Sequence, residues 1–293
     1  MHASVIAVLH SAALATLTDW EWQPAIVAPL ALTAVLYARG VSLLWRDGQH
    51  RGAKRWQVAS FACGWLITLL ALVSPMHALS EQLFSAHMVQ HELLMVIAAP
   101  LLVLGRPMVV MLWGLPRHWR PIVGGVAHNR SVRSVWAVLT RPFDAWLIHG
   151  IVIWLWHVPV LFQATLQSEA AHAAQHISFV ATALLFWWAI IHPARRAALG
   201  MSVVYLFTTA VHTGALGALM SFARTPWYPE YASRSAAWGL TPLGDQQLAG
   251  MIMWIPASLV YLVAALLIVR RWLGDSEWAV TQRQRTSFAV SPR

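Results

Sequence analysis

Two pairs of histidines with the same spacing could bind a metal ion in this sequence. His87 and His91 open one apolar run, and His172 and His176 begin another. Residues four apart lie on one face of a helix, about 6 Å apart along its axis, so each pair can offer two nitrogens to one ion. Inside a membrane an imidazole without a partner is costly, which makes it a candidate for function by default. We therefore predict that the two pairs meet and hold one metal ion.

The composition places these histidines in a membrane. The chain has 293 residues, of which 58% are hydrophobic and only 11% are charged, whereas a soluble domain carries about 25% charged residues. A spanning helix needs about 20 apolar residues. Seven runs are long enough, and the sequence therefore predicts an all-α, polytopic membrane helix bundle with seven transmembrane helices near 23–45, 57–79, 87–105, 143–165, 171–192, 201–223 and 247–269.

The positive charges of the loops predict the orientation of the bundle. All but three of the 20 basic residues fall in the segments that we assign to one side, which are 46–56, 106–142, 193–200 and 270–293. Basic loops stay in the cytoplasm, so the N-terminus is predicted outside and the C-terminus inside. The net charge of +9 is then a topology signal, and we expect no nucleic-acid partner. The partners of such a surface are membrane lipids.

The chain divides into three parts on this interpretation. Residues 1–22 form a periplasmic N-terminal segment or leader, 23–269 the seven-span membrane domain, and 270–293 a cytoplasmic tail. The apolar run 3–17 ends like a cleavage site but is too short to span, so a removed leader and an outer interfacial segment both stay open. The outer loop 224–246, rich in tyrosine and tryptophan, is expected to be an ordered lid or partner surface.

The histidines of the predicted spans prefer one leaflet. Seven of them fall in the outer half of the membrane or at its outer surface, from five different spans. A hydrogen bond between helices explains a single membrane histidine, but it does not explain two pairs that begin at the same depth. Our predicted metal ligands are His87, His91, His157, His172, His176 and His212. Weaker ligand or supporting candidates are His77, Glu92, Asp245, Met251 and Met253.

The residue types favour copper among the metals. Imidazole suits zinc, copper, iron and nickel, and nearby thioethers select Cu(I), so we place Cu(I) ahead of zinc. Met251 and Met253 are the thioethers nearest the outer side of the last span, although such methionines usually serve packing. Glu92 could orient a ligating imidazole. Asp245 precedes the last span, where an ordinary helix N-cap is expected.

Several separate motifs, in the same order, resemble those of the CtaG-type cytochrome c oxidase assembly factors. The resemblance runs from about Trp20 to Arg271. The motifs are His87-Met-Val-Gln-His91 with Pro100-Leu-Leu-Val-Leu-Gly105, Trp156-His157-Val-Pro159, His172-x-x-x-His176, His212-Thr213, Pro226-Trp-Tyr-Pro229 and Asp245-Gln-Gln-Leu-Ala-Gly250. One departure is Gln175, which stands where the family pattern often has glutamate before the second histidine.

The resemblance implies a non-enzymatic assembly factor of the bacterial inner membrane. Such a protein would bind copper at a periplasm-side histidine site and assist its delivery to the copper B centre of cytochrome c oxidase subunit I. A periplasmic copper donor would be a further partner.

Other functions stay open at this point. A copper transporter or copper-homeostasis protein would need a second set of ligands at the inner face, where His149 and His192 are the only candidates. A haem-b protein would use two histidines from different spans. An intramembrane metal hydrolase is disfavoured because no His-Glu-x-x-His arrangement occurs.

Overall fold

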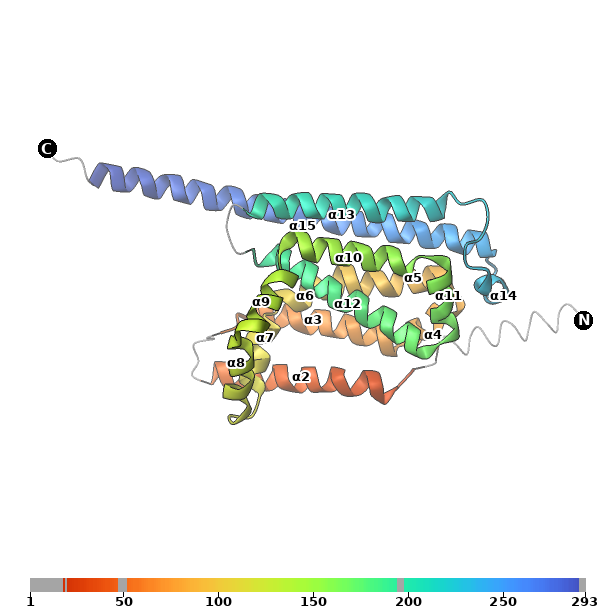
Figure 1. Ribbon diagram of the computed structural model, residues 1–293, viewed down its shortest axis with the longest axis horizontal. Helices are drawn as coiled ribbons and strands as arrows, with labels where there is room; N and C mark the ends of the chain where they lie inside the picture. Colours follow the sequence, from red (N-terminus) through yellow and green to blue (C-terminus); the bar gives the residue numbers. More distant parts are fainter. Residues whose placement is uncertain (1–17, 19, 47–51, 194–197, 290–293) are drawn as a thin grey trace, which may run out of the picture.

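The computed structural model describes residues 18, 20–46, 52–193 and 198–289, and it is helical throughout its regular structure (Figure 1). Helices make up 86% of it, and this described part has no strand. Six of its helices are long and apolar enough to cross a membrane. They are α2 (Pro24–Trp45), α3 (Arg55–Val73), the run α5 to α6 (Phe84–Leu104), α12 (Glu169–Ile191), α13 (Ala198–Ser221) and α15 (Pro242–Ala289). The all-helical membrane bundle is thus confirmed, whereas its orientation stays a prediction. The leader predicted in 3–17 lies outside the described residues.

The run from Phe84 to Leu104 is the most enclosed span. Its apolar window is 61% buried within the bundle, compared with 17% for α2 and 17% for α15. The run consists of α5 (Phe84–Glu92), the π-helical turn η1 (Leu93–Ala98) and α6 (Ala99–Leu104). The spans α3, α12 and α15 pack directly against it, so the first histidine pair sits on the most enclosed element of the fold.

Pro100 leaves a backbone carbonyl of this span available for a hydrogen bond with α12. Pro100 has no backbone N–H and cannot donate the helical hydrogen bond to the turn before it. The carbonyl of Met95 that this leaves free accepts a hydrogen bond of 2.9 Å from the indole of Trp187 in α12. Backbone groups within a bilayer need such a partner from the protein. The contact therefore fixes the two helices that carry the histidine pairs against each other.

The second span is shorter than predicted. Instead of reaching residue 79, α3 ends at Val73, and a separate helix, α4 (Pro75–Gln82), follows. Ser74 is extended and its side chain accepts a hydrogen bond from Met76 N, so it caps α4. Proline at the first position of a helix completes this start signal. Because of α4, His77 is buried inside the bundle rather than at its outer edge.

The fourth predicted span is broken, and its continuous course over 143–165 was wrong. The helix α10 (Pro142–Trp156) is followed by a second helix, α11 (Pro159–Gln167). Val158 adopts an extended conformation because a residue before proline disfavours the helical region. With 15 residues, α10 is about 22 Å long. It counts as a seventh span only when joined to α9 (Arg130–Leu139), from which it bends by 67°.

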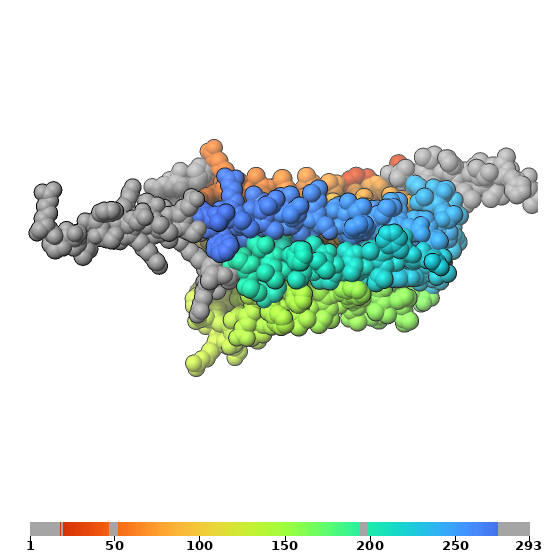
Figure 2. All heavy atoms as spheres, turned by 90° about the horizontal axis from the view of Figure 1, so that it is seen from above, coloured from red at the N-terminus to blue at the C-terminus, as the bar shows by residue number. Residues whose placement is uncertain are grey.

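The helices α13 and α15 lie side by side along the bundle (Figures 1 and 2). Gly217 and Gly250 face each other where they meet. A Cβ at Gly250 would lie 2.5 Å from the carbonyl oxygen of Gly217, and the reverse distance is 2.8 Å. Small residues that let two backbones approach in this way are typical of membrane helix pairs.

The loop 224–246, which the sequence places outside the membrane, is ordered as predicted. It contains η2 (Pro229–Tyr231), α14 (Ala232–Ser235) and η3 (Ala236–Trp238). The hydroxyl of Tyr231 donates to Ser80 O at 3.1 Å, and that of Tyr228 donates to His157 O at 2.8 Å. Burial raises the pKa of Tyr231, so its hydroxyl keeps the proton that it donates. The loop forms a lid over one end of the bundle.

The opposite end carries short helices that the bundle does not enclose. No residue of α8 (Trp119–His128) or of α9 is buried, and large apolar side chains such as Trp119 and Val135 are exposed. Both helices lie at the end of the bundle away from α4 and α11 (Figure 1). This arrangement suits the predicted interfacial position.

Candidate metal centre

Five imidazole rings from three helices form one cluster at the lid end of the bundle. They belong to His77 in α4, His87 and His91 in α5, and His172 and His176 in α12, and we call them the histidine cluster. The ring centroids are 4.2 Å apart for His87 and His91, 5.2 Å for His91 and His176, and 5.7 Å for His87 and His172. The structure thus brings the two predicted pairs together.

Four of these rings hold buried nitrogen atoms that have no hydrogen-bond partner within the described part of the chain. These atoms are Nε2 of His87, of His172 and of His176, and both ring nitrogens of His91. Buried polar atoms are nearly always paired, and leaving one unpaired costs free energy. Each neutral ring has one nitrogen with a lone pair, and a cation bound among the rings would satisfy it. The donor set therefore fits a metal ion.

His157 lies beside the cluster with one nitrogen prepared for a ligand. Its Nδ1 is 2.7 Å from the carbonyl oxygen of Ile153, to which it donates. The proton is then on Nδ1, and the buried Nε2 keeps a lone pair with no partner among the described residues. Metal-binding histidines commonly use such a carbonyl to fix the tautomer. The ring of Phe179 lies in contact distance of His157 and His91, with its centroid 6.4 Å from that of His157 and 4.7 Å from that of His91.

The structure does not bring His212 into the cluster. Its Nδ1 accepts a hydrogen bond of 3.3 Å from Trp154, and its ring lies 6.2 Å from that of Trp146. Both tryptophans belong to α10, and no ring contact joins His212 to the cluster within the described residues. His149 is also separate, because its Nδ1 lies 3.0 Å from Thr182 Oγ1.

Asp245 holds the start of the helix that carries the first histidine pair. Its Oδ2 accepts a hydrogen bond of 2.7 Å from Phe84 N, and its Oδ1 accepts bonds of 3.0 Å and 2.5 Å from the N–H and hydroxyl of Ser85. The first N–H groups of a helix have no partner inside it. The expected cap of the last span is provided by Thr241 instead, whose hydroxyl accepts from Gly244 N at 3.0 Å. Asp245 therefore caps a different helix from the one that we predicted.

The remaining weaker candidates make no ring contact with the cluster among the described residues. Met253 is 3% exposed within the hydrophobic core, whereas Met251 is 42% exposed on the outside of the bundle. Glu92 has a buried Oε2 without a partner in the described structure, and it lies near Tyr261. Gln175, where the resemblance suggested a lost carboxylate, is fully buried.

Sequence reasoning missed Glu81. The ligand atoms of His77, Glu81 and His172 all lie within 4.8 Å of one another, as is needed for three groups to hold one ion. The missed signal was the spacing, because His77 and Glu81 are four apart like the two histidine pairs. The helix α4 places both residues on one face, whereas the sequence predicts a span over 57–79 that ends before Glu81.

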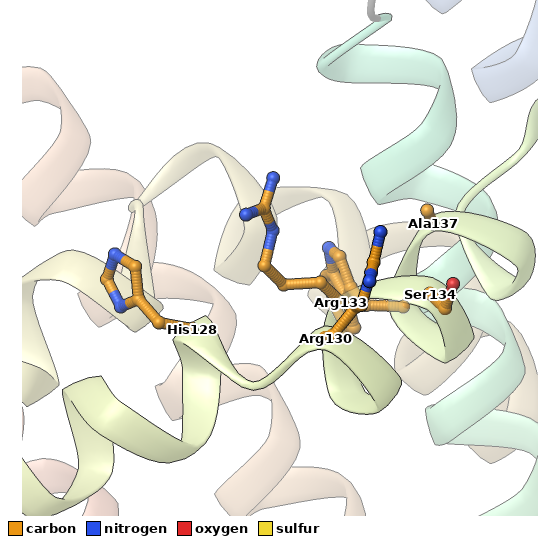
Figure 3. Close-up of a pocket in the computed structure, with 6 residues that line it drawn as sticks. His128, Arg130, Arg133, Ser134 and Ala137 are labelled. Atoms are coloured by element: carbon orange, nitrogen blue, oxygen red, sulfur yellow. The ribbon is translucent and has the colours of Figure 1, made fainter.

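A hollow of about 520 Å³ lies at the opposite end of the molecule. It is lined by His128, Arg130, Arg133, Ser134, Trp136 and Ala137, and Figure 3 shows arginine side chains beside it. Arginine has no lone pair to offer a metal ion, so His128 is the one imidazole or carboxylate among these lining residues. This hollow is therefore no alternative metal site.

Comparison with known proteins gives a family match. The model of the family described as cytochrome c oxidase caa3 assembly factor matches residues 35–275. Among curated proteins, uncharacterised proteins of Mycobacterium bovis and Mycobacterium tuberculosis are each 27% identical over 287 residues, and one of Mycobacterium leprae is 25% identical over 286 residues. The alignments cover 92% of this chain but only 42%, 42% and 41% of those proteins, so the chain spans about two fifths of the length of the curated relatives it matches. No solved structure matches it significantly.

Proposed function

We propose a function from the premise that this chain belongs to the cytochrome c oxidase caa3 assembly factor family. Membership makes it a membrane protein of oxidase assembly. The finer proposal is that it binds Cu(I) in the histidine cluster and assists delivery of copper to the copper B centre of oxidase subunit I. The ion is the cargo of the chain, and the chain itself catalyses no reaction.

The observation that carries the proposal is the set of unpartnered imidazole nitrogens. A histidine kept for packing should find a hydrogen bond, as His149 does with Thr182. The buried Nε2 atoms of His87, His91 and His176 have no hydrogen bond among the described residues. Imidazole is a ligand for copper and zinc, and neutral imidazoles can release an ion one ligand at a time. Such a site suits an ion that is handed on.

The other functions that the sequence left open have less support. A carrier across the membrane needs ligands at the far end, but His149 is paired and the ring of His192 stacks on Trp188 with centroids 4.4 Å apart. A haem between two histidines requires the macrocycle to pass between their rings. In the cluster, rings such as those of His172 and His176 contact each other directly, with centroids 4.5 Å apart.

The test is made in cells that produce the oxidase. His91→Ala should insert at normal abundance, because spanning helices are held by packing and internal backbone bonds. The oxidase should then accumulate with haem but with too little copper, and with low activity. The measurement is copper and haem content of the purified oxidase beside the abundance of the factor.

The matched control is His128→Ala, which removes an exposed histidine at the opposite end and should leave oxidase copper at the wild-type level. Wild-type oxidase copper in the His91→Ala strain would refute the proposal for this residue. Disappearance of the variant from the membrane would show that His91 is structural. In the proposed orientation, a reporter fused after Arg271 is cytoplasmic.

A further inference from the structure

We propose that this protein has a second metal site, for a divalent ion, at the mouth of the histidine cluster. Its ligands are His77, Glu81 and His172, which we call the outer trio. The ligand atoms of the trio lie within 4.8 Å of one another. The carboxylate of Glu81 is exposed while His77 is 6% exposed, so the trio connects solvent with the buried rings.

The fold fixes the three side chains relative to one another. The helix α4 starts rigidly with Ser74 as its cap and Pro75 at its first position, and His77 and Glu81 are one turn apart on it. Arg234 in the lid donates a hydrogen bond of 2.7 Å to the backbone carbonyl of Glu81. This bond leaves the carboxylate free to bind an ion, because it uses only the main chain.

The two imidazoles of the trio face each other, and His172 keeps a buried nitrogen for an ion. The rings of His77 and His172 are stacked with centroids 5.5 Å apart, and the buried Nε2 of His172 has no partner among the described residues. Gln90 Nε2 donates to Ala71 O at 2.7 Å and lies 3.0 Å from His77 Nδ1. His77 Nε2 is left facing the carboxylate of Glu21, 3.5 Å away.

Binding an ion at His77 Nε2 requires the ring proton to be on Nδ1. The amide of Gln90 can accommodate this change, because its Oε1 is buried without a partner in the described structure. Rotating the amide would let Oε1 accept from Nδ1–H, with loss of the bond to Ala71 O. Gln90 stands between His87 and His91 on α5, so it joins the outer trio to the rest of the cluster.

The donor atoms distinguish this site from the proposed Cu(I) site. Two imidazoles and a carboxylate form a mixed nitrogen and oxygen set, with the carboxylate of Glu21 close by. Such sets suit Cu(II) and Zn(II), and zinc bound by two histidines and a glutamate keeps an open position. The other rings of the histidine cluster, those of His87, His91 and His176, offer imidazole nitrogens alone. His172 touches both sets, since its ring also stacks on that of His87 at 5.7 Å.

A role of the trio in passing copper to the histidine cluster rests on the copper function proposed above. The divalent site itself does not depend on that function. The test uses the full chain purified in detergent. Cu(II) binding is followed by electron paramagnetic resonance, Zn(II) binding by displacement of that signal, and Cu(I) binding by competition with a chromogenic chelator. The variants are Glu81→Gln and His87→Ala/His91→Ala.

The outer trio predicts opposite results for the two variants. Glu81→Gln should weaken Cu(II) binding by about tenfold or more and leave Cu(I) binding unchanged, since ligand and orienting groups change affinity by this order. His87→Ala/His91→Ala should lose Cu(I) and keep the Cu(II) signal with its imidazole nitrogen couplings. Glu169→Gln, an exposed carboxylate on α12 at the same end, is the matched control and should bind both ions like wild type.

Three results would overturn the second site. The first is a wild-type affinity for Cu(II) in Glu81→Gln, and the second is an equal loss of Cu(II) affinity in Glu169→Gln. The third is a loss of both Cu(I) and Cu(II) binding in Glu81→Gln, because the two sets of ligands would then form one site. If wild type binds Cu(II) but no Cu(I), the copper function fails and the divalent site stands.

Discussion

The two ends of the bundle differ in how their polar side chains are satisfied. At the lid end, imidazoles such as those of His87 and His91 are buried, and their free nitrogens lack partners within the described residues. At the other end, Arg130, Arg133 and His128 are exposed around an open hollow (Figure 3). Water and lipid headgroups satisfy exposed charges at little cost, whereas a buried nitrogen without a partner raises the free energy of the fold.

Exposed and buried polar residues carry different information about function. Exposed arginines indicate how the chain sits in the membrane, because loop charge sets orientation. They do not reveal a ligand site. Buried unpartnered imidazoles indicate a ligand, because the fold tolerates them only where something else satisfies them.

The largest effect is expected from removing the first histidine pair. His87→Ala/His91→Ala takes two of the proposed ligands and should weaken Cu(I) binding by more than about 100-fold, since loss of even an orienting group costs about 10- to 100-fold. The measurement is chelator competition on detergent-purified protein. Equal Cu(I) affinity in the variant and wild type would remove the functional distinction between the two ends.

A smaller effect is expected from the cap of the first pair. Asp245→Ala removes the acceptor of three hydrogen bonds at the start of α5, and loss of a helix cap costs about 1 kcal/mol, with more for a buried charged acceptor. The apparent unfolding temperature should fall. Because His87 and His91 would lose their fixed helix start, Cu(I) affinity should fall about tenfold.

The control for the cap is Ser85→Ala, which removes one of the three bonds and leaves both backbone N–H groups capped. It should lower the unfolding temperature less than Asp245→Ala does. If Asp245→Ala destabilises the chain without any change in Cu(I) affinity, the cap supports the fold but does not position the histidines.

A histidine with a partner should affect stability and spare metal binding. His149→Ala removes the hydrogen bond to Thr182 and a stacked ring contact with Phe186, whose centroid is 5.3 Å away. Loss of a buried ring and its bond should cost about 2 kcal/mol, while Cu(I) affinity stays at the wild-type value. Weakened copper binding without destabilisation would contradict the division between paired and unpaired histidines.

The smallest effect is expected at the arginine-lined end. His128 is exposed, and its Nδ1 lies 2.6 Å from the carbonyl oxygen of Gly124 in its own helix. His128→Ala should therefore change neither Cu(I) affinity nor the unfolding temperature beyond the error of measurement. A loss of copper in this variant would show that histidines at both ends bind metal, as a transporter requires.

The sequence by itself determined the class of the fold and most of the histidine cluster. Apolar runs of about 20 residues predict spanning helices because a bilayer leaves the backbone no other partner. The spacing of four in His87 and His91, repeated in His172 and His176, places each pair on one helical face. Both statements depend only on local geometry, so they could be made without the tertiary structure.

Only the tertiary structure decided which helix faces meet. It placed His212 against the tryptophans of α10, moved His77 inward through α4, and added Glu81 to the group. It also showed that the carboxylate of Asp245 caps α5, although 160 residues separate it from Ser85 in the chain. Local spacing fixes the direction of a side chain around its own helix. The rotation of that helix against its neighbours depends on packing contacts between distant segments, which no single stretch of sequence contains.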